Sequence, residues 1–317
     1  MKEVLKIYIA TLDSSKKIYV AYSGGVDSHV LLHALSELRS DLPHLDLNAI
    51  HIHHGMQKEA DSWDEHCKTV CHELNVAYVS KKVLVEIKGG DSPEAEARKA
   101  RYEAFKSLIG DHYLLLAQHL EDQTETCLLQ LCRGSGIKGL AAMPMQKKLG
   151  NGIMLRPLLS VSKASILDYA KQHDLKNIED PSNQDEKYAR NFLRKRVLPL
   201  LREHYPSLDT SIARTTRHAS EANELLDQLA EKDLNSAINE SKKTLSAEKL
   251  FELSEARMRN TLRFWIQREG FILPSSSILE RIIKDILSSK KDAKPVVEWG
   301  NAKITRVSDT VSLLCRA

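Results

Sequence analysis

The sequence predicts an α/β protein in which a doubly wound, mostly parallel sheet is followed by a smaller, mainly helical C-terminal domain. In the first half of the chain, short apolar runs of strand length alternate with amphipathic stretches of helix length. Strands separated by single helices form right-handed βαβ units, and such units build a parallel sheet with helices on its faces. After residue 134 this alternation ends and helical patterns dominate. The length of 317 residues is sufficient for two domains.

Four strands of the first domain are expected in order along the chain, at residues 17–22, 47–53, 77–85 and 113–117. Helices are expected between them, at residues 29–42, 61–75 and 93–109. In sheets of this kind, ligands bind at the carboxyl ends of the strands. The loop at residues 23–28, the turn at 51–55 and the strand exit at 116–119 should therefore meet at one edge and form a single site.

The second half is expected to be organised differently. Residues 134–157 contain five glycines and two prolines, which predicts loops and short turns. Further helices are expected at residues 121–132, 162–173 and 188–198, the last ending before Pro199. The C-terminal part is expected to contain helices at 246–253, 255–268 and 276–287, then strands at 296–299, 303–307 and 311–314. We therefore divide the chain into a catalytic domain at 1–208, a helical connector at 209–237 and a C-terminal domain at 238–317.

Composition excludes several classes of protein. Hydrophobic residues make up 42% and charged residues 28%, as in ordinary globular proteins. No apolar run approaches the roughly 18 residues needed to span a membrane, and the first residues do not resemble a signal peptide. The five cysteines form no C-x-x-C pair, so neither a zinc ribbon nor an iron–sulfur cluster is supported. Reduced thiols and a cytoplasmic location are expected.

The most informative string is Ser23-Gly24-Gly25-Val26-Asp27-Ser28, between the first strand and the first helix. A glycine turn at a helix N-terminus presents backbone N–H groups and a positive dipole to phosphate. The loop lacks the lysine of the Walker type and has Asp27 instead, which implies a Mg²⁺ ion between the carboxylate and the phosphates. The string resembles the pyrophosphate loop of ATP pyrophosphatases. The structural alternative is an ordinary Gly-Gly turn after a strand.

A second string follows the fourth strand. Residues 117–126 read AQHLEDQTET, and they open the helix expected at 121–132. Asp122 and Glu125 are three residues apart, so their carboxylates share one helix face. Beside a phosphate loop, such a pair can hold Mg²⁺ or bind an ammonium group. The alternative is that these acids only cap the helix.

Basic residues are concentrated between positions 187 and 217. Two acids, Glu203 and Asp209, oppose eight basic residues, namely Lys187, Arg190, Arg194, Lys195, Arg196, Arg202, Arg214 and Arg217. This density predicts a polyanionic partner larger than ATP. The alternative is a solvated helix face.

Taken together, the strings resemble the tRNA(Ile)-lysidine synthetase family. They occur in order at residues 23–28, 100–102, 119–126, 133–136, 139–140, 156–159, 179–183 and 188–194. The resemblance covers residues 17 to about 202. It implies the fold of the pyrophosphate-loop ATPases, which is similar to that of the adenine nucleotide alpha hydrolases.

The resemblance also implies a two-step ligation that forms a carbon–nitrogen bond. The enzyme would adenylate the C2 oxygen of the cytidine at the first anticodon position of the CAU-anticodon isoleucine tRNA. The amine of free L-lysine would then displace AMP. The products would be lysidine, AMP and diphosphate, and decoding would change from AUG to AUA. ATP and Mg²⁺ are the implied cofactors.

Candidate roles follow for individual residues. ATP would bind to Ser23, Gly24, Gly25, Val26, Asp27 and Ser28, with Asp27 as the ligand of Mg²⁺. Arg101 and Arg133 would stabilise charge as the α–β phosphate bond breaks; the alternative is a surface or ion-paired arginine. Asp122 and Glu125 would bind the substrate lysine. Arg190, Arg194 and Lys195 would present one cationic face to the tRNA backbone, although an arginine within a family string can instead turn inward to the site.

Two other functions remain as alternatives. A tRNA cytidine thiolase shares the loop, but the missing C-x-x-C pair counts against sulfur chemistry. A non-catalytic nucleotide-binding tRNA partner would have no use for Asp27, Asp122 and Glu125. The sequence leaves open the oligomeric state, with a homodimer among the alternatives. It also leaves open whether the chain is naturally short, because longer family members carry a further C-terminal domain.

Overall fold

The computed structural model describes residues 1–53, 55, 59–84, 93–181, 185–239, 241, 243–289 and 293–316. The chain forms two compact units, Met1–Ser220 and Glu221–Ala317, each of which is described by itself. Their boundary falls within α10 (Leu208–Ala237), a helix of 30 residues. No helix in the described ranges is long and apolar enough to cross a membrane.

The first unit is built on a six-stranded sheet in the order β3-β2-β1-β4-β6-β5. The strands are β1 (Ile18–Ala21), β2 (Leu47–His53), β3 (Ala77–Lys82), β4 (Tyr113–Leu115), β5 (Gln146–Leu149) and β6 (Gly152–Leu155). All neighbouring strands pair in parallel except β5, which runs antiparallel to β6. The predicted fold class and its first four strands are confirmed, with β3 and β4 shorter than expected.

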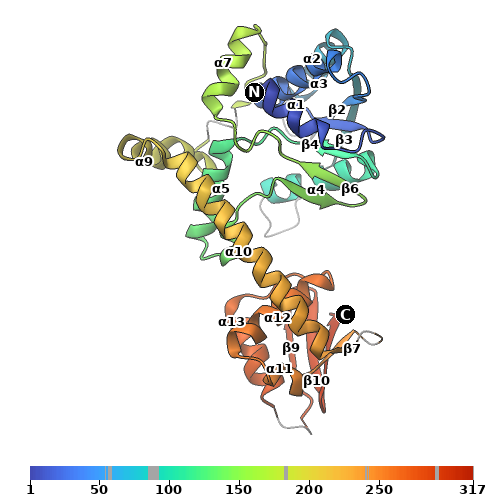
Figure 1. The fold of residues 1–317 in the computed structure, drawn as a ribbon, viewed down its shortest axis with the longest axis vertical. Coiled ribbons are helices and arrows are strands. Elements are labelled where there is room, and N and C mark those ends of the chain that lie inside the picture. The colour runs from blue at the N-terminus through green and yellow to red at the C-terminus, as the bar shows by residue number, and fades with distance from the viewer. Residues whose placement is uncertain are drawn as a thin grey trace. The chain divides into compact units, whose positions relative to one another are not determined.

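Helices cover both faces of this sheet (Figure 1). One face packs against α1 (Lys2–Ala10), α2 (Val26–Glu37), α3 (Ala60–Glu73) and α7 (Lys163–Gln172). The other face packs against α4 (Pro93–Ile109). Alternate residues of β4 point to opposite faces, so Tyr113 and Leu115 join the first core and Leu114 joins the second.

The order of the strands places a switch point between β1 and β4. From β1 the chain continues through α2 to β2 on one side, whereas β4 lies on the other side and leads into α5 (Leu120–Cys132). At such a point the loops leaving adjacent strands diverge and open a crevice at their carboxyl ends. The loop after β1 and the N-terminus of α5 are therefore neighbours.

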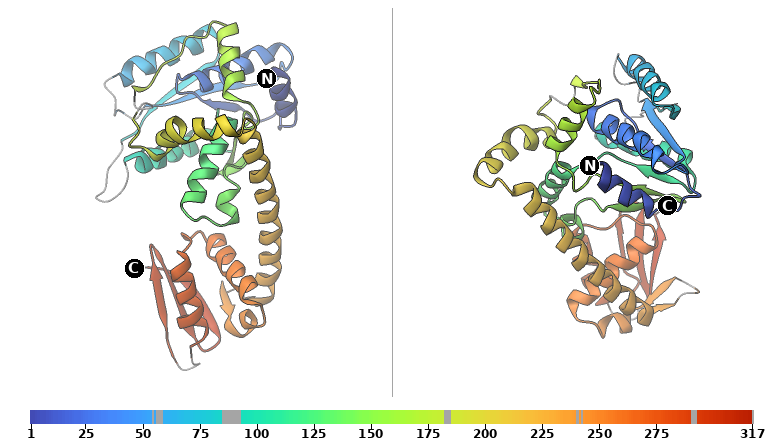
Figure 2. Two further views of the ribbon diagram at one scale, coloured as in Figure 1. Left: turned by 90° about the vertical axis from the view of Figure 1, so that its left-hand side faces the viewer. Right: turned by 45° about the horizontal axis from the view of Figure 1, so that its top comes forward.

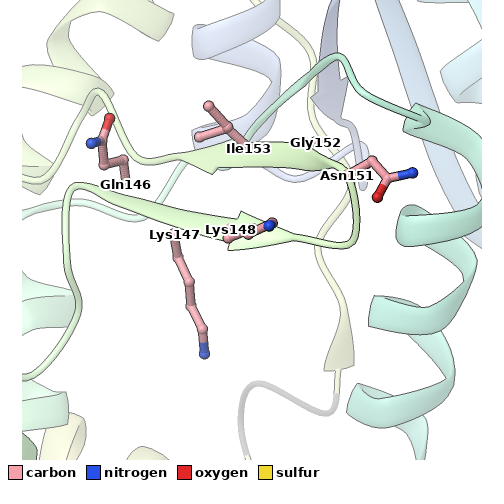
Figure 3. A pocket seen from close by; sticks show the side chains of 6 residues that line it. All are labelled: Gln146, Lys147, Lys148, Asn151, Gly152 and Ile153. Atoms are coloured by element: carbon pink, nitrogen blue, oxygen red, sulfur yellow. The ribbon is translucent and has the colours of Figure 1, made fainter. Parts of the chain in front are cut away.

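Residues 134–157 contain more regular structure than expected. They include α6 (Ile137–Leu140) and the β5–β6 hairpin, through which the sheet gains two strands. No long element occurs here, as predicted, but the two paired strands were not anticipated, because four-residue strands are too short to show an apolar periodicity. Gly152 is required there, since a Cβ atom would lie 2.5 Å from the His112 carbonyl oxygen. Figure 3 shows a pocket on this hairpin, with the Lys147 side chain extending away from its strand.

The predicted helix at 188–198 does not end before Pro199. It consists of α8 (Ala189–Phe192), a π-helical turn η3 (Leu193–Val197) and α9 (Leu198–His204). Pro199 lies in the first turn of α9. Proline is tolerated there because the first N–H groups of a helix have no intrahelical acceptor. The predicted ending was wrong for this reason.

The second unit contains a five-stranded antiparallel sheet in the order β7-β8-β11-β10-β9. Its strands are β7 (Ile238–Asn239), β8 (Thr244–Ser246), β9 (Val296–Trp299), β10 (Ala302–Val307) and β11 (Thr310–Cys315). Its helices are α11 (Ala247–Phe251), α12 (Glu255–Arg268), α13 (Ser276–Arg281) and the π-helical η4 (Ile282–Leu287), which pack on the sheet (Figure 2). Trp265 of α12 is fully buried in this core. The expected helices and the last three strands are confirmed, and β7 and β8 were not anticipated.

Candidate active site

The loop between β1 and α2 requires glycine at position 24 for two reasons. The φ angle of Gly24 is +79°, a left-handed conformation that side chains rarely adopt. A Cβ atom at this position would also lie 2.4 Å from Cδ1 of Ile178. The Gly24 carbonyl accepts a hydrogen bond of 2.9 Å from the Ile178 backbone N–H. This close approach fixes the backbone of the loop against a distant segment.

The two serines of the loop brace the same backbone. Ser28 is buried, and its Oγ donates a hydrogen bond to the Gly25 carbonyl at 3.0 Å. This Oγ also accepts from the backbone N–H of Ser23 at 3.2 Å. Ser23 itself is exposed. Val26 and Asp27 then open α2, whose first N–H groups have no intrahelical acceptors. A helix N-terminus of this kind is suited to bind an anion.

The side chain of His51, near the end of β2, contacts the backbone just after β1. Its Nδ1 lies 2.9 Å from the Tyr22 carbonyl oxygen. Burial lowers the pKa of His51, and the hydrogen bond to Tyr22 only partly opposes this. The ends of β1 and β2 therefore meet as predicted, with the imidazole favoured in its neutral form. Residues 54 and 56–58 of the same turn lie outside the described ranges.

The N-terminus of α5 holds a cluster of interacting charges. Asp122 accepts a hydrogen bond of 3.1 Å from the backbone N–H of His119, which is the N-cap residue. The imidazole Nδ1 of His119 lies 3.0 Å from Glu121, and its Nε2 lies 3.5 Å from Asp122. Burial lowers the pKa of His119, but Glu121 and the negative charges of Asp122 and Asp27 outweigh it and raise the pKa above its ordinary value. Asp27 of the loop and Asp122 of α5 therefore act on the same imidazole.

Asp27 forms an ion pair with a residue that the sequence did not single out. Nζ of Lys163, the first residue of α7, lies 2.5 Å from Oδ1 of Asp27. The backbone N–H of Lys163 donates to both carboxylate oxygens of Glu121, at 3.0 and 2.9 Å. Burial raises the pKa of Glu121, but the hydrogen bonds from His119 and Lys163 keep it below its ordinary value. Lys163 therefore joins the phosphate loop to α5.

One signal in the sequence points to Lys163. A cation in the first turn of a helix is disfavoured by the helix dipole unless an anion lies nearby. The predicted helix at 162–173 begins with Ser162 and Lys163, and it has no acid in its first turn. The stabilising acids come from elsewhere in the fold.

Glu125 is almost completely buried, with 1% of its side chain exposed, and is paired with two arginines. Arg194 donates from Nε to Oε1 at 2.6 Å and from a terminal nitrogen to Oε2 at 2.9 Å. Arg190 forms an ion pair with the same carboxylate at 3.1 Å. Arg194 also reaches Asp122 at 3.3 Å. A buried carboxylate is tolerated only when it is paired in this way.

The predicted tRNA-contacting residues thus differ in their surroundings. Arg190 and Arg194 turn inward to the acids of α5, the alternative raised by their place in a family string. Lys195 is partly exposed on η3. A further brace holds this region, because Arg202 donates two hydrogen bonds to Asp209, which also accepts from Thr124 of α5 at 2.6 Å.

The remaining two arginines, Arg101 and Arg133, lie outside the phosphate loop and the N-terminus of α5. Arg133 is the C-cap of α5, eleven residues beyond Asp122, which corresponds to about 16 Å along the helix. Arg101 is exposed on α4, which covers the face of the sheet opposite α2 and α7. Their catalytic roles remain predictions. The family string at 179–183 is only partly described, since residues 182 and 183 lie outside the described ranges.

The residues around Asp27 fit a Mg²⁺ ion that is bound mainly through nucleotide. Within the described residues there is no group of three or more potential protein ligands that could hold a metal alone. Mg²⁺ is commonly bound by one or two carboxylates together with phosphate oxygens and waters. Asp27 supplies one partly exposed carboxylate at the N-terminus of α2, where the phosphates are expected.

Comparison with solved structures addresses the fold. The U34-tRNA thiolase NcsA from Methanococcus maripaludis has a TM-score of 0.58 and 18% sequence identity. The match covers 69% of this chain and 77% of that protein. At this identity the likeness concerns the fold alone.

Comparison of sequences addresses the family. A PP-loop domain model matches residues 1–201, and a TilS substrate binding domain model matches residues 245–311. The tRNA(Ile)-lysidine synthase of Coxiella burnetii is 43% identical, over 96% of this chain and 67% of its own length. The protein of the same name from Legionella pneumophila strain Lens is 41% identical, over 97% and 70%. That of Serratia proteamaculans is 43% identical, over 96% and 69%. Since these matches cover both units and the phosphate loop, the chain belongs to the tRNA(Ile)-lysidine synthase family.

Proposed function

We propose that this protein ligates lysine to C2 of the first-anticodon-position cytidine of the CAU-anticodon isoleucine tRNA, through an adenylated tRNA intermediate. One observation carries the proposal: Asp27 of the phosphate loop and the acids of α5 belong to one connected cluster at the switch point of the sheet. Family membership over both units supports the same reaction. Such a reaction takes place in the cytoplasm, where the tRNA and free lysine are available.

In the first step, the phosphates of ATP bind to the N–H groups at the start of α2. Gly24 and Gly25 allow close backbone approach, and exposed Ser23 can donate from its hydroxyl. Asp27 would hold Mg²⁺, which supplies positive charge to the phosphate oxygens when bound. The C2 oxygen of the cytidine attacks the α-phosphorus and pyrophosphate leaves.

In the second step, an amine of lysine in its neutral form attacks C2, and the bond from C2 to the oxygen that carries AMP breaks. The electron pair of that bond leaves with AMP, and the nitrogen releases one proton. The side-chain ammonium of the lysine substrate needs an anionic partner. Asp122 suits this role more directly than Glu125, because Glu125 is paired with two guanidinium groups and has only 1% of its side chain exposed. Asp122 contacts one of these guanidinium groups, that of Arg194 at 3.3 Å, and has 13% of its side chain exposed. We therefore assign the ammonium first to Asp122, with Glu125 fixing the position of Arg194 beside it.

The tRNA backbone would contact the basic segment through Lys195 together with Arg190 and Arg194. Arg194 has 41% of its side chain exposed, so it can face a phosphate while keeping its bond to Glu125. Arg190 and Arg194 would thereby link the bound tRNA to the acids that bind lysine.

The direct test is incorporation of labelled lysine into a CAU-anticodon tRNA transcript in the presence of ATP and Mg²⁺. A transcript with uridine in place of the reactive cytidine is the control. We expect lysine-dependent labelling and AMP formation with the first transcript only. Modification that proceeds without lysine but needs a sulfur donor would favour a thiolase, and tRNA binding without AMP formation would favour a non-catalytic partner.

A further inference from the structure

We propose that Lys163 is a catalytic residue whose ammonium binds the phosphates of ATP and stabilises the departing pyrophosphate. The inference rests on the proposed function, because it assigns a role in its first step. The supporting observation is the contact between Lys163 and Asp27. Lys163 is not part of the loop sequence, but the fold places its ammonium beside Asp27, which lies 136 residues earlier in the chain.

The ammonium lies at the place where phosphates are expected. Asp27 is in the first turn of α2, and Nζ of Lys163 is within hydrogen-bond distance of its carboxylate. The first N–H groups of α2 point toward the same region. A Lys163 ammonium has three N–H donors, so its bond to Asp27 leaves two for other acceptors.

The position of the ammonium suits contact with a phosphate bound at the loop. Nζ of Lys163 lies 2.5 Å from Oδ1 of Asp27, the carboxylate in the first turn of α2. The same carboxylate would hold Mg²⁺, which supplies positive charge to the phosphates when bound. A phosphate held at the N-terminus of α2 would therefore lie near the Lys163 ammonium as well as the first N–H groups of the helix.

The first step develops negative charge that such a cation would stabilise. A bond forms between the C2 oxygen of cytidine and the α-phosphorus, and the bond from the α-phosphorus to the bridging oxygen breaks. The electron pair leaves with pyrophosphate, so negative charge grows on its oxygens. Lys163 would donate hydrogen bonds to these oxygens without transferring a proton. A fixed charge aimed at growing charge is an efficient form of catalysis.

The side chain of Lys163 is not needed to hold α7 in place. The helix is fixed by its backbone N–H bonds to Glu121 and by the Ser162 cap. It is also fixed by Ile166 and Tyr169, which are buried against α2 and the sheet. Removing only the ammonium should therefore leave the helix packed, which makes the proposal testable by substitution.

The test compares Lys163→Met with Lys171→Met, an exposed lysine of the same helix. Pyrophosphate release is measured in single turnover with CAU-anticodon tRNA and ATP, without lysine. We expect Lys163→Met to slow release by about 100-fold or more, the usual effect of losing one charge-stabilising donor. Lys163→Arg should fall between wild type and Lys163→Met, and Lys171→Met should match wild type.

A second measurement does not depend on activity. Binding of the unreactive analogue α,β-methylene-ATP is measured in EDTA, so that no metal contributes. We expect Lys163→Met to weaken binding about tenfold, as for the loss of one hydrogen bond to a charged group. Unchanged analogue binding together with unchanged pyrophosphate release would overturn the inference. Wild-type protein that forms no AMP would instead overturn the proposed function, so the two failures are distinguishable.

Discussion

At the scale of single residues, the site depends on a few charged side chains and the ion pairs between them. Asp27 belongs to the metal and the leaving group, and its carboxylate contributes nothing to a polyanion surface. We predict that Asp27→Asn abolishes pyrophosphate release and leaves tRNA affinity within about twofold, since one exposed amide hardly alters phosphate contacts. Filter binding and single-turnover assays measure the two quantities. Asp168→Asn, at an exposed position of α7, serves as the control. Wild-type turnover in Asp27→Asn would remove this residue from the mechanism.

Glu125 and Asp122 should respond differently to loss of charge. Glu125→Gln leaves two guanidinium groups without their buried anion, so we expect a loss of about 1–3 kcal/mol in the free energy of unfolding. The loss stays below that of a fully buried pair because Arg194 is partly exposed. Asp122→Asn should raise the KM for lysine more while destabilising less. Urea denaturation and lysine titration separate these effects, and equal stability losses in both variants would contradict the assignment.

His119 should give the site a pH dependence of stability. Its folded-state pKa is raised above the ordinary 6.5, since Glu121 and Asp122 outweigh its burial. The stabilisation is therefore complete below about pH 6.5 and is lost as the pH rises through the folded-state pKa. We expect the melting temperature of the wild type to fall relative to that of His119→Gln as the pH rises above 6.5. If the melting temperatures of the two proteins change with pH in parallel, the charged imidazole of His119 does not stabilise the folded state.

At the scale of elements, the basic segment combines an ion pair within the site and a proposed contact with tRNA. Arg194 is tied to Glu125, whereas Lys195 follows it on η3 with a partly exposed side chain. We predict that Lys195→Ala lowers the salt dependence of tRNA binding by about one charge, and that Arg194→Ala with Lys195→Ala lowers it by up to about two. Binding of α,β-methylene-ATP should hardly change in Lys195→Ala. Lys171→Ala is the control. If the salt dependence of tRNA binding is unaltered in these variants, the basic segment is a solvated helix face and does not contact tRNA.

Elements also show how far sequence reasoning reaches. The strand β1, the loop at 23–28 and α5 follow from local patterns, because each combines strong periodicity with a turn or cap. The β5–β6 hairpin does not, since its stability comes from pairing with β4 rather than from its own residues. Lys163 was missed for the same reason: its ion pair with Asp27 exists only once α7 packs against α2. Local sequence patterns do not predict contacts between segments that are distant in the chain.

At the scale of the whole molecule, each unit has a core of its own. Trp265 is fully buried in the second core, and its indole N–H has no hydrogen-bond partner among the described residues. We predict that Trp265→Ala costs the second unit about 3–5 kcal/mol, whereas Trp265→Phe costs much less because no hydrogen bond is lost. Calorimetry should show one transition lowered and the other unchanged. Weakened binding of α,β-methylene-ATP in Trp265→Ala would show that the cores are not independent.

The separation of Asp27 and Lys163 by 136 residues also has a consequence for the protein during its synthesis. At about 5–20 residues per second, the ribosome exposes the phosphate loop roughly ten seconds before it exposes the lysine that completes it. The strand β4, which must pair beside β1, also emerges only in that interval. We therefore expect a nascent chain to display the loop without holding nucleotide tightly. Ribosome-bound chains stalled before and after α7 would differ in nucleotide retention, and the competence to consume ATP would arrive late in translation.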